Sequence, residues 1–373
     1  MSAMITSTLP ETSAAIDGVD LVVGTRDKFD VVALSGDFRK RGLAQVFVSC
    51  IDEADAFEAA YAADADGRTR AFLKVQDGCD YTCSFCTIPK ARGESRSVEA
   101  HAIVAQARQI AAQGFREIVL SGVNVGDYGR KIGTSLLALL RELEHIDGIE
   151  RYRISSIEPN LLTPEIVEFV LGSSKFCDHF HIPLQSGSDT VLGDMRRRYT
   201  TAFYAGLVER IRAAAPEAGI GADVITGFPG ETDALFEETY AFLAGLPVSY
   251  LHVFTYSERQ GTPAASSEAR VEPKVRFARN ERLRMLGLKK RHAFQAAFLG
   301  RELPILLEHP AGEEQMSGLS ANYLRVRVPG GNELANALVT ARITALSDDH
   351  CLGEIRRTNA STTNEPVLMA AGY

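Results

Sequence analysis

Residues 72–96, FLKVQDGCDYTCSFCTIPKARGESR, hold three of the six cysteines in this chain of 373 residues. Cys79, Cys83 and Cys86 form a C-x3-C-x2-C pattern directly after a short apolar run that predicts a β-strand. Three thiolates this close together can face one metal centre, and Gly78 allows the backbone to turn tightly around it. The pattern therefore predicts a metal site at the end of a strand.

The number of cysteines favours an iron–sulfur cluster over zinc. A structural zinc site takes four tetrahedral ligands, commonly from two C-x2-C pairs, and the sequence has no second pair. A cubane cluster is normally held by four cysteines, so three of them leave one iron open to a substrate or cofactor. The competing interpretation is a chance grouping of structural cysteines, although buried cysteines rarely occur as such triplets.

The cysteine spacing, with the aromatic Phe85 before the last cysteine, resembles the radical S-adenosylmethionine (SAM) superfamily. Five further segments occur in an order that resembles the methylthiotransferase family, and most closely its MtaB branch, which modifies threonylcarbamoyladenosine beside the anticodon of tRNA. They are LSGVNVGDYG (120–129), RISSIEPN (153–160), HIPLQSGSDTVLGDMRRRYT (181–200), ADVITGFPGET (222–232) and HVFTYSERQGTPA (252–264). The resemblance runs from about residue 18 to the C-terminus.

This resemblance implies a transferase that adds a methylthio group to C2 of N6-threonylcarbamoyladenosine. It implies one [4Fe-4S] cluster bound by Cys79, Cys83 and Cys86, with SAM as cofactor. The implied partners are the anticodon stem-loop of tRNA and a reducing protein such as flavodoxin or ferredoxin. Three alternatives stay open: a radical SAM enzyme of another reaction type, a ribosomal-protein methylthiotransferase, and a non-enzymatic RNA-binding protein with a structural metal.

The chain departs from the family at its N-terminus. Family members begin with a domain in which three further cysteines hold a second cluster, whereas residues 18–28 resemble only the end of that domain. The last of these three cysteines would fall near Met4, where the sequence has none, and Cys50 lies after the matching segment. Either the true start lies upstream, or the second cluster has been lost, and in the latter case the full reaction is in doubt.

Beyond the cysteine loop, short β-rich runs alternate with amphipathic segments, which predicts an α/β domain with a parallel sheet. Periodicity alone leaves a doubly wound sheet open, whereas the resemblance implies a partial (β/α)6 barrel. The quoted segments follow predicted strands, at the edge where parallel α/β folds bind ligands. The predicted strands are 71–75, 117–121, 152–156, 179–184, 221–226 and 251–256, with one helix over 98–113.

Four parts are expected along the chain. Residues 1–64 resemble a remnant of the family's N-terminal α/β domain plus a linker, and 65–298 form the radical SAM core. Short strand-like runs at 303–307, 323–328, 338–343 and 351–356 predict a small β-barrel over 299–360, which resembles the RNA-binding TRAM domain. Residues 361–373 are expected to be a disordered tail.

Residues at the predicted strand ends are candidate SAM contacts, and the resemblance adds an aromatic for the adenine and an arginine for the SAM carboxylate. Several candidates also have an ordinary structural role that competes with this one. Phe85 could be a hydrophobic plug over the cluster, residues 121–124 a turn, Glu158 a salt-bridged carboxylate and Arg198 a solvent-facing side chain. Asp223 and Thr226 are also expected to face the pocket. The candidate cofactor contacts are Phe85, Ser121, Gly122, Asn124, Ser156, Glu158, Gln185, Ser186 and Arg198.

The net charge of −8 and the pI of about 5.6 exclude a surface that is basic throughout, so any RNA contact is local. A basic helical stretch at 272–298 carries Arg284, Lys289 and Lys290 as candidate phosphate contacts. The competing interpretation is an amphipathic helix whose arginine stems cover the core. With no apolar run of membrane-spanning length and no signal-peptide pattern, a cytoplasmic protein without a membrane partner is expected.

Overall fold

The computed structural model describes residues 3–5, 10–36, 43–49, 61–62, 69–312 and 314–358. The expected tail and most of the expected linker lie outside these ranges. None of the helices in them combines the length and apolar character needed to cross a bilayer.

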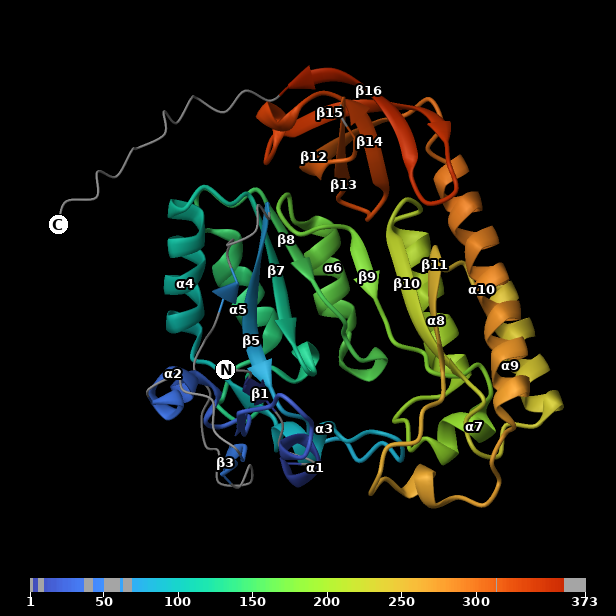
Figure 1. The fold of residues 1–373 in the computed structure, drawn as a ribbon. Coiled ribbons are helices and arrows are strands. Elements are labelled where there is room, and N and C mark those ends of the chain that lie inside the picture. Colours follow the sequence, from blue (N-terminus) through green and yellow to red (C-terminus); the bar gives the residue numbers. More distant parts are fainter. Residues whose placement is uncertain are drawn as a thin grey trace.

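Six parallel strands curl into a half-barrel that is open on one side (Figure 1). One sheet contains β5, β7 and β8, and a second contains β9, β10 and β11. A parallel bridge between Ser156 and His181 joins the two sheets. The partial (β/α)6 barrel is thereby confirmed over the doubly wound alternative. The strands are β5 (Arg70–Asp77), β7 (Glu117–Gly122), β8 (Arg151–Ile154), β9 (His179–His181), β10 (Gly219–Thr226) and β11 (Tyr250–Thr255).

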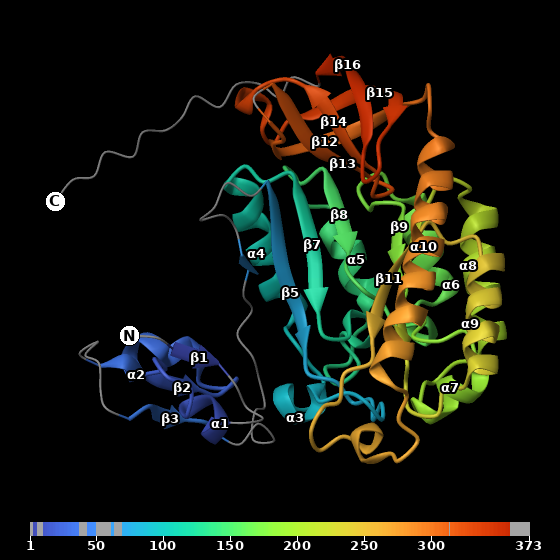
Figure 2. The same cartoon turned by 45° about the vertical axis from the view of Figure 1, so that its right-hand side comes forward.

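Helices cover the outer face of the half-barrel (Figures 1 and 2). Several begin where a hydroxyl accepts a hydrogen bond from the helix backbone, as Thr200 does from Phe203 and Thr232 from Leu235. Their apolar stripes pack on the strands, where residues such as Ile103, Leu139 and Phe236 are almost fully buried. The helices are α4 (Ala100–Ala112), α5 (Leu136–Glu144), α6 (Pro164–Gly172), α8 (Thr201–Ala214), α9 (Asp233–Gly245) and α10 (Pro273–Ala296); α3 (Ile88–Arg92) and α7 (Asp189–Asp194) are shorter.

The C-terminal part is a closed β-barrel, as predicted, with the strand order β12-β13-β14-β16-β15. The strand β13 was not predicted, because its sequence QMSGLS is poor in strand-forming residues. Gly318 fits there since a Cβ would lie 2.4 Å from the Leu306 carbonyl oxygen. The strands are β12 (Glu302–Pro310), β13 (Gln315–Ser320), β14 (Arg325–Pro329), β15 (Leu338–Leu346) and β16 (Cys351–Thr358).

The N-terminal part is a small α/β unit, also as predicted. Its three parallel strands are ordered β1-β2-β3, and it contacts the core where the Thr25 hydroxyl donates to the Ala91 carbonyl in α3 at 3.0 Å. Its elements are β1 (Ala3–Ile5), α1 (Pro10–Ala14), β2 (Leu21–Val23), α2 (Val31–Ser35) and β3 (Gln45–Phe47); the core sheet adds β4 (Tyr61–Ala62) and β6 (Arg96–Ser97).

The C-terminal barrel lies over the N-terminal ends of the core strands, away from α3 (Figure 1). Two buried arginines of β8 hold it there. Arg151 donates to the Leu319 and Pro304 carbonyls at 2.9 and 2.7 Å, and Arg153 to the Ala321 and Ser320 carbonyls at 2.9 and 3.1 Å. Glu117, fully buried in β7, balances their charge and bonds to Arg153 Nε at 3.1 Å. The barrel is therefore attached through polar contacts to backbone.

Candidate cluster and cofactor site

The cysteine loop leaves β5 through a turn that requires glycine. Gly78 has a φ of +72°, and a Cβ there would lie 1.9 Å from the Glu94 carbonyl oxygen. The fully buried Gln76 fixes the loop, because its amide donates to the Gly78 carbonyl at 2.7 Å while its oxygen accepts from the Asn124 N–H at 2.7 Å. The loop and the end of β7 are thus held together.

The three cysteines follow one another on this loop, but their sulfurs do not all lie within 4.8 Å of one another as the ligand atoms of a preformed metal site would. The backbone N–H groups of Tyr81 and Ile88 donate to the sulfurs of Cys79 and Cys86, each at 3.4 Å. Burial raises the pKa of Cys79 to about 11, and the charges of Cys83 and Cys86 add to this effect. Burial also raises the pKa of Cys86, and thiols that are costly to ionise fit a metal centre, since iron binds the thiolate form and offsets that cost.

Arg197 connects the cluster loop to the third strand end. Its guanidinium donates to the Cys83 sulfur at 3.2 Å, pairs with Glu158 and bonds to the Tyr199 hydroxyl at 3.0 Å. Burial raises the pKa of Glu158, and the charge of Arg197 opposes that rise. Of the three adjacent arginines, sequence reasoning singled out Arg198, which lies exposed beside the loop over the Tyr81 ring at 3.8 Å. It missed Arg197.

A buried amide at the end of β7 lacks partners. Asn124 is 3% exposed, and neither its side-chain nitrogen nor its oxygen has a hydrogen-bond partner among the described residues. Ser121 and Gly122 beside it are half-buried. Because buried polar groups are nearly always paired, this amide fits a polar ligand such as SAM at the strand ends. The residues present are therefore compatible with the cofactor.

The other predicted cofactor contacts have partners within the chain. Ser186 is fully buried and bonds to Thr239 of α9 at 3.1 Å. Gln185 has a φ of +72° and its backbone N–H donates to the Asp223 carbonyl at 2.8 Å. Phe85 meets Phe228 edge-on, with ring centres 6.2 Å apart, as a plug would. Their contacts to SAM remain predictions.

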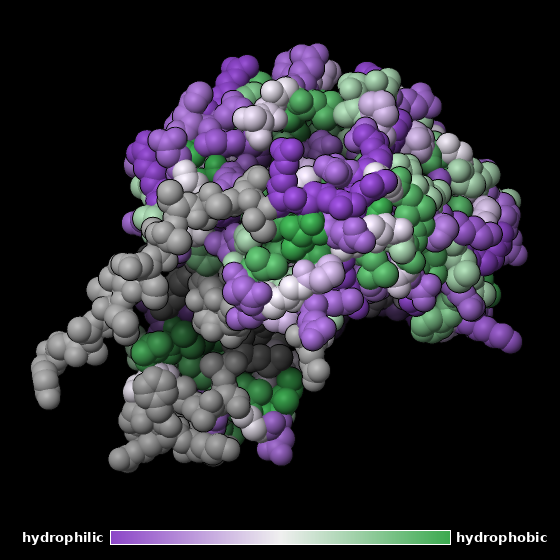
Figure 3. All heavy atoms as spheres, turned by 90° about the horizontal axis from the view of Figure 1, so that it is seen from above, coloured by the Kyte–Doolittle hydropathy of each residue, from purple (hydrophilic) through white to green (hydrophobic). Residues whose placement is uncertain are grey.

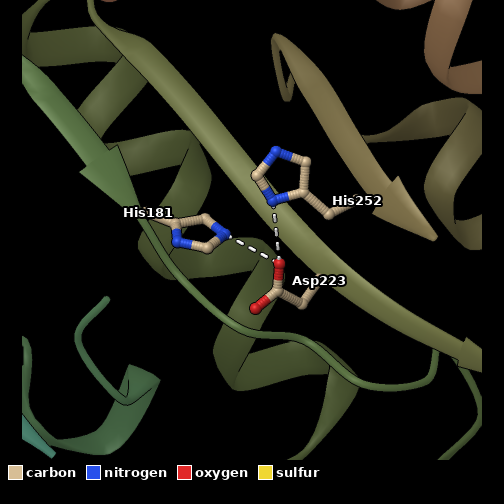
Figure 4. A group of neighbouring side chains, drawn as sticks. All are labelled: His181, Asp223 and His252. Atoms are coloured by element: carbon tan, nitrogen blue, oxygen red, sulfur yellow. Dashed lines mark hydrogen bonds and ion pairs between the residues drawn. The ribbon is translucent and has the colours of Figure 1, made fainter. Parts of the chain in front are cut away.

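A row of polar side chains crosses the inner face of the half-barrel, from the end of β9 to the interior of β10 and β11 (Figure 4). Asp223 Oδ1 faces His181 Nε2 at 2.8 Å and His252 Nδ1 at 3.2 Å, and the Ser156 hydroxyl lies 2.7 Å from His181 Nδ1. Burial alone would raise the pKa of Asp223, but the two histidines lower it to about 2. Asp223 thus faces the inside of the half-barrel, and its place in a cofactor pocket stays a prediction.

His181, Asp223 and His252 are also of the residue types that bind metals, and their ligand atoms lie within 4.8 Å of one another. Their hydrogen bonds already account for the geometry. Sequence reasoning missed His181 and His252, although His179 and His181 are two residues apart in β9 and therefore lie on the same face, which gave a signal that this face of the strand is polar. The prediction for Thr226 was wrong, because that side chain is fully buried and its hydroxyl contacts the Phe254 and Arg276 carbonyls.

The three-cysteine loop after the first strand of a parallel half-barrel defines a radical SAM protein, and the radical SAM superfamily profile matches residues 73–243. The chain belongs, within it, to the radical SAM methylthiotransferase family, and it is a transferase that uses a [4Fe-4S] cluster and SAM.

The similarity to members of this family extends over most of the chain. A threonylcarbamoyladenosine tRNA methylthiotransferase, MtaB, of Bacillus subtilis is 39% identical over 90% of this chain and 76% of its own length. A tRNA-2-methylthio-N(6)-dimethylallyladenosine synthase of Cereibacter sphaeroides is 38% identical over 90% of this chain and 76% of its own. The solved radical SAM methyltransferase TsrM of Kitasatospora setae aligns with a TM-score of 0.46 at 18% identity, over 52% of this chain and 38% of its own.

Proposed function

We propose that this protein replaces the C2 hydrogen of N6-threonylcarbamoyladenosine, next to the tRNA anticodon, by a methylthio group. The observation that carries the proposal is the similarity to the enzymes of that name from Bacillus subtilis and Aquifex aeolicus, at 39% and 37% identity over 90% and 87% of this chain. The polar row of Ser156, His181, Asp223 and His252 supports it, because this substituent carries hydrogen-bond donors and a carboxylate.

We further propose that Cys79, Cys83 and Cys86 hold the cluster, and that Asn124 and the Arg197–Glu158 pair border the SAM site. When bound, the cluster supplies the electron that cleaves SAM into methionine and a 5′-deoxyadenosyl radical. Arg197 donates to the Cys83 sulfur, while Gln76 holds the loop against β7. Phe85 and Phe228 close the apolar side of the loop and exclude water. A flavodoxin or ferredoxin in the cytoplasm is the proposed reductant.

For RNA contact we propose exposed cations of α10 together with the C-terminal barrel. Arg284 and Lys289 are exposed, while Lys290 donates to the Leu246 and Ala244 carbonyls at 2.7 and 3.2 Å and so caps α9. Hydrophilic side chains cover much of the barrel side of the molecule, with smaller apolar areas between them (Figure 3). We retain 65–298 as the proposed core and 299–360 as the proposed RNA-binding module.

A second candidate substrate is N6-dimethylallyladenosine, which the similar Cereibacter enzyme is named for. This substituent is apolar and would face the ionised Asp223 without pairing with it, which disfavours it here. The similarity to the tRNA-modifying enzymes named above does not favour the ribosomal-protein and non-enzymatic alternatives.

The test is anaerobic incubation of the reconstituted protein with SAM as radical source and methyl donor, a reductant, added sulfide as sulfur source, and tRNA that carries threonylcarbamoyladenosine but no methylthio group. Mass spectrometry of the digested nucleosides is expected to show the methylthio product with the wild type and none with Cys79→Ala. Product from dimethylallyladenosine tRNA alone would support the second candidate instead.

A further inference from the structure

A small pocket lies where the core meets the C-terminal barrel. It has a volume of about 200 Å³, a size suited to a small polar group and not to a whole nucleotide. Its wall includes Tyr250 and His252 from β11, Arg291 from α10, and Tyr323 and Arg325 from the barrel. His252 belongs to this wall and also to the polar row, so the pocket continues from the inside of the half-barrel.

Arg291 is the feature of this pocket that most needs a ligand. It is half-buried and makes no hydrogen bond or ion pair with any residue in the described ranges. Three of the four other arginines of α10 are paired, Arg276 with Glu258 at 2.7 Å, Arg279 with Glu231 at 2.7 Å and Arg282 with Glu237 at 2.6 Å, and the fourth, Arg284, is exposed to solvent. A partly desolvated guanidinium without an acidic partner favours an anionic ligand.

The other side of the pocket is rigid and aromatic. Tyr323 stacks on His179 with ring centres 4.4 Å apart and lies 5.9 Å from Tyr250, and the Tyr250 hydroxyl bonds to His179 at 2.8 Å. Tyr323 has a φ of +72°, which is costly for a tyrosine and requires that its surroundings hold it. At Gly221 a Cβ would lie 2.2 Å from the Tyr250 ring, so glycine makes room for this stack.

We infer that this pocket receives the anionic threonylcarbamoyl substituent of the substrate base, with the carboxylate on Arg291 and His252 and the hydroxyl or N–H groups near Asp223. The inference rests on the proposed function and deepens it. Asp223 Oδ2 points away from both histidines and is free to accept (Figure 4). Asp349, an acidic residue of the wall, is bonded to His350 at 2.6 Å.

The length of the threonylcarbamoyl substituent matches the depth of the pocket below the strand ends. Asp223 and His252 each lie three residues before the ends of β10 and β11, which places them about 10 Å below the strand ends at the rise of an extended chain. By standard bond lengths, the carboxylate of the fully extended substituent reaches up to about 10 Å from C2 of the adenine. A base whose C2 faces the cofactor at the strand ends therefore brings its carboxylate to the level of the pocket.

The test compares the affinity of the full, cluster-loaded protein for two synthetic anticodon stem-loops, one with N6-threonylcarbamoyladenosine and one with adenosine at the same position. We expect the wild type to bind the modified loop about tenfold or more tightly, since a charge-assisted hydrogen bond contributes that much. Arg291→Ala is expected to reduce the preference to near one, and Arg291→Lys to retain part of it.

The matched control is Arg284→Ala, which removes the same side chain from the exposed face of the same helix. It is expected to weaken binding of both loops by one common factor and leave the preference intact. A wild-type preference that persists in Arg291→Ala, or a wild type that methylthiolates the modified loop without binding it preferentially, would overturn the inference alone. A wild type that forms no methylthio product on this loop would overturn the proposed function as well.

Discussion

Replacing Arg153 by Met is expected to loosen the C-terminal barrel from the core. Arg153 is 3% exposed and bonds to Glu117 and to two barrel carbonyls, those of Ser320 and Ala321. Burial would raise the pKa of Glu117, and Arg153 is the foremost charge that lowers it. Removing one member of a buried ion pair typically costs 3–5 kcal/mol. Arg151 and Arg70 remain 4.0 and 3.9 Å from Glu117, so we expect about 3 kcal/mol.

The assay uses the cluster-free protein and has two readouts. Urea unfolding gives the change in the free energy of unfolding, and limited proteolysis reports how readily the chain is cleaved between α10 and β12. Arg342→Met, an exposed arginine of the barrel, serves as control and is expected to change the free energy by less than about 0.5 kcal/mol. The double variant Glu117→Gln, Arg153→Met is expected to lose less than the sum of the single changes. A cost below about 1 kcal/mol for Arg153→Met, or strict additivity, would refute the reasoning.

Three further outcomes are expected. Arg197→Met removes a hydrogen bond to the Cys83 sulfur and is expected to lower the reduction potential of the cluster in an EPR-monitored titration; an unchanged potential would contradict that role. Gly78→Ala places a Cβ against the Glu94 carbonyl, so iron bound after anaerobic reconstitution is expected to fall severalfold, whereas Gly172→Ala, in open space, is expected to load normally. The pKa of Asp223 is lowered to about 2 from its ordinary 3.8, so its ionised form adds about 2 kcal/mol of stability above pH 4, and this contribution is lost as the pH falls through 2. In the cluster-free protein, the difference in stability between the wild type and Asp223→Asn is therefore expected to shrink over that pH range. A difference that stays constant with pH would argue against this role of Asp223.

Much of the core could be predicted because its signals are local. Each apolar strand run ends in a polar segment, and the observed β5, β7, β10 and β11 begin and end within two residues of the predicted limits. The strand β13 could not be found this way, because its stability comes from pairing with β12 and β14 on both sides rather than from its composition. Tertiary context overrides a weak strand propensity there.

The site was harder to predict, since its residues meet only in the folded chain. Because residues 196–198 are consecutive, their three arginine side chains were expected to point in different directions. Only the fold shows that Arg197 reaches Cys83 while Arg198 lies over Tyr81. Likewise, Asp223 and His252 are paired in register across β10 and β11, and nothing in either segment alone announces this contact. Contacts across strands depend on the register in which the strands pair, and that register cannot be determined from a single sequence.

The most direct test of the central claim is the amount of 5′-deoxyadenosine formed when the anaerobically reconstituted protein is reduced in the presence of SAM. If Cys79, Cys83 and Cys86 hold a cluster with an open iron, the wild type forms 5′-deoxyadenosine and methionine in equal amounts, and the variant with all three changed to Ala forms neither. A wild type that binds iron and SAM but leaves SAM intact, or a triple variant that still cleaves it, would contradict the account.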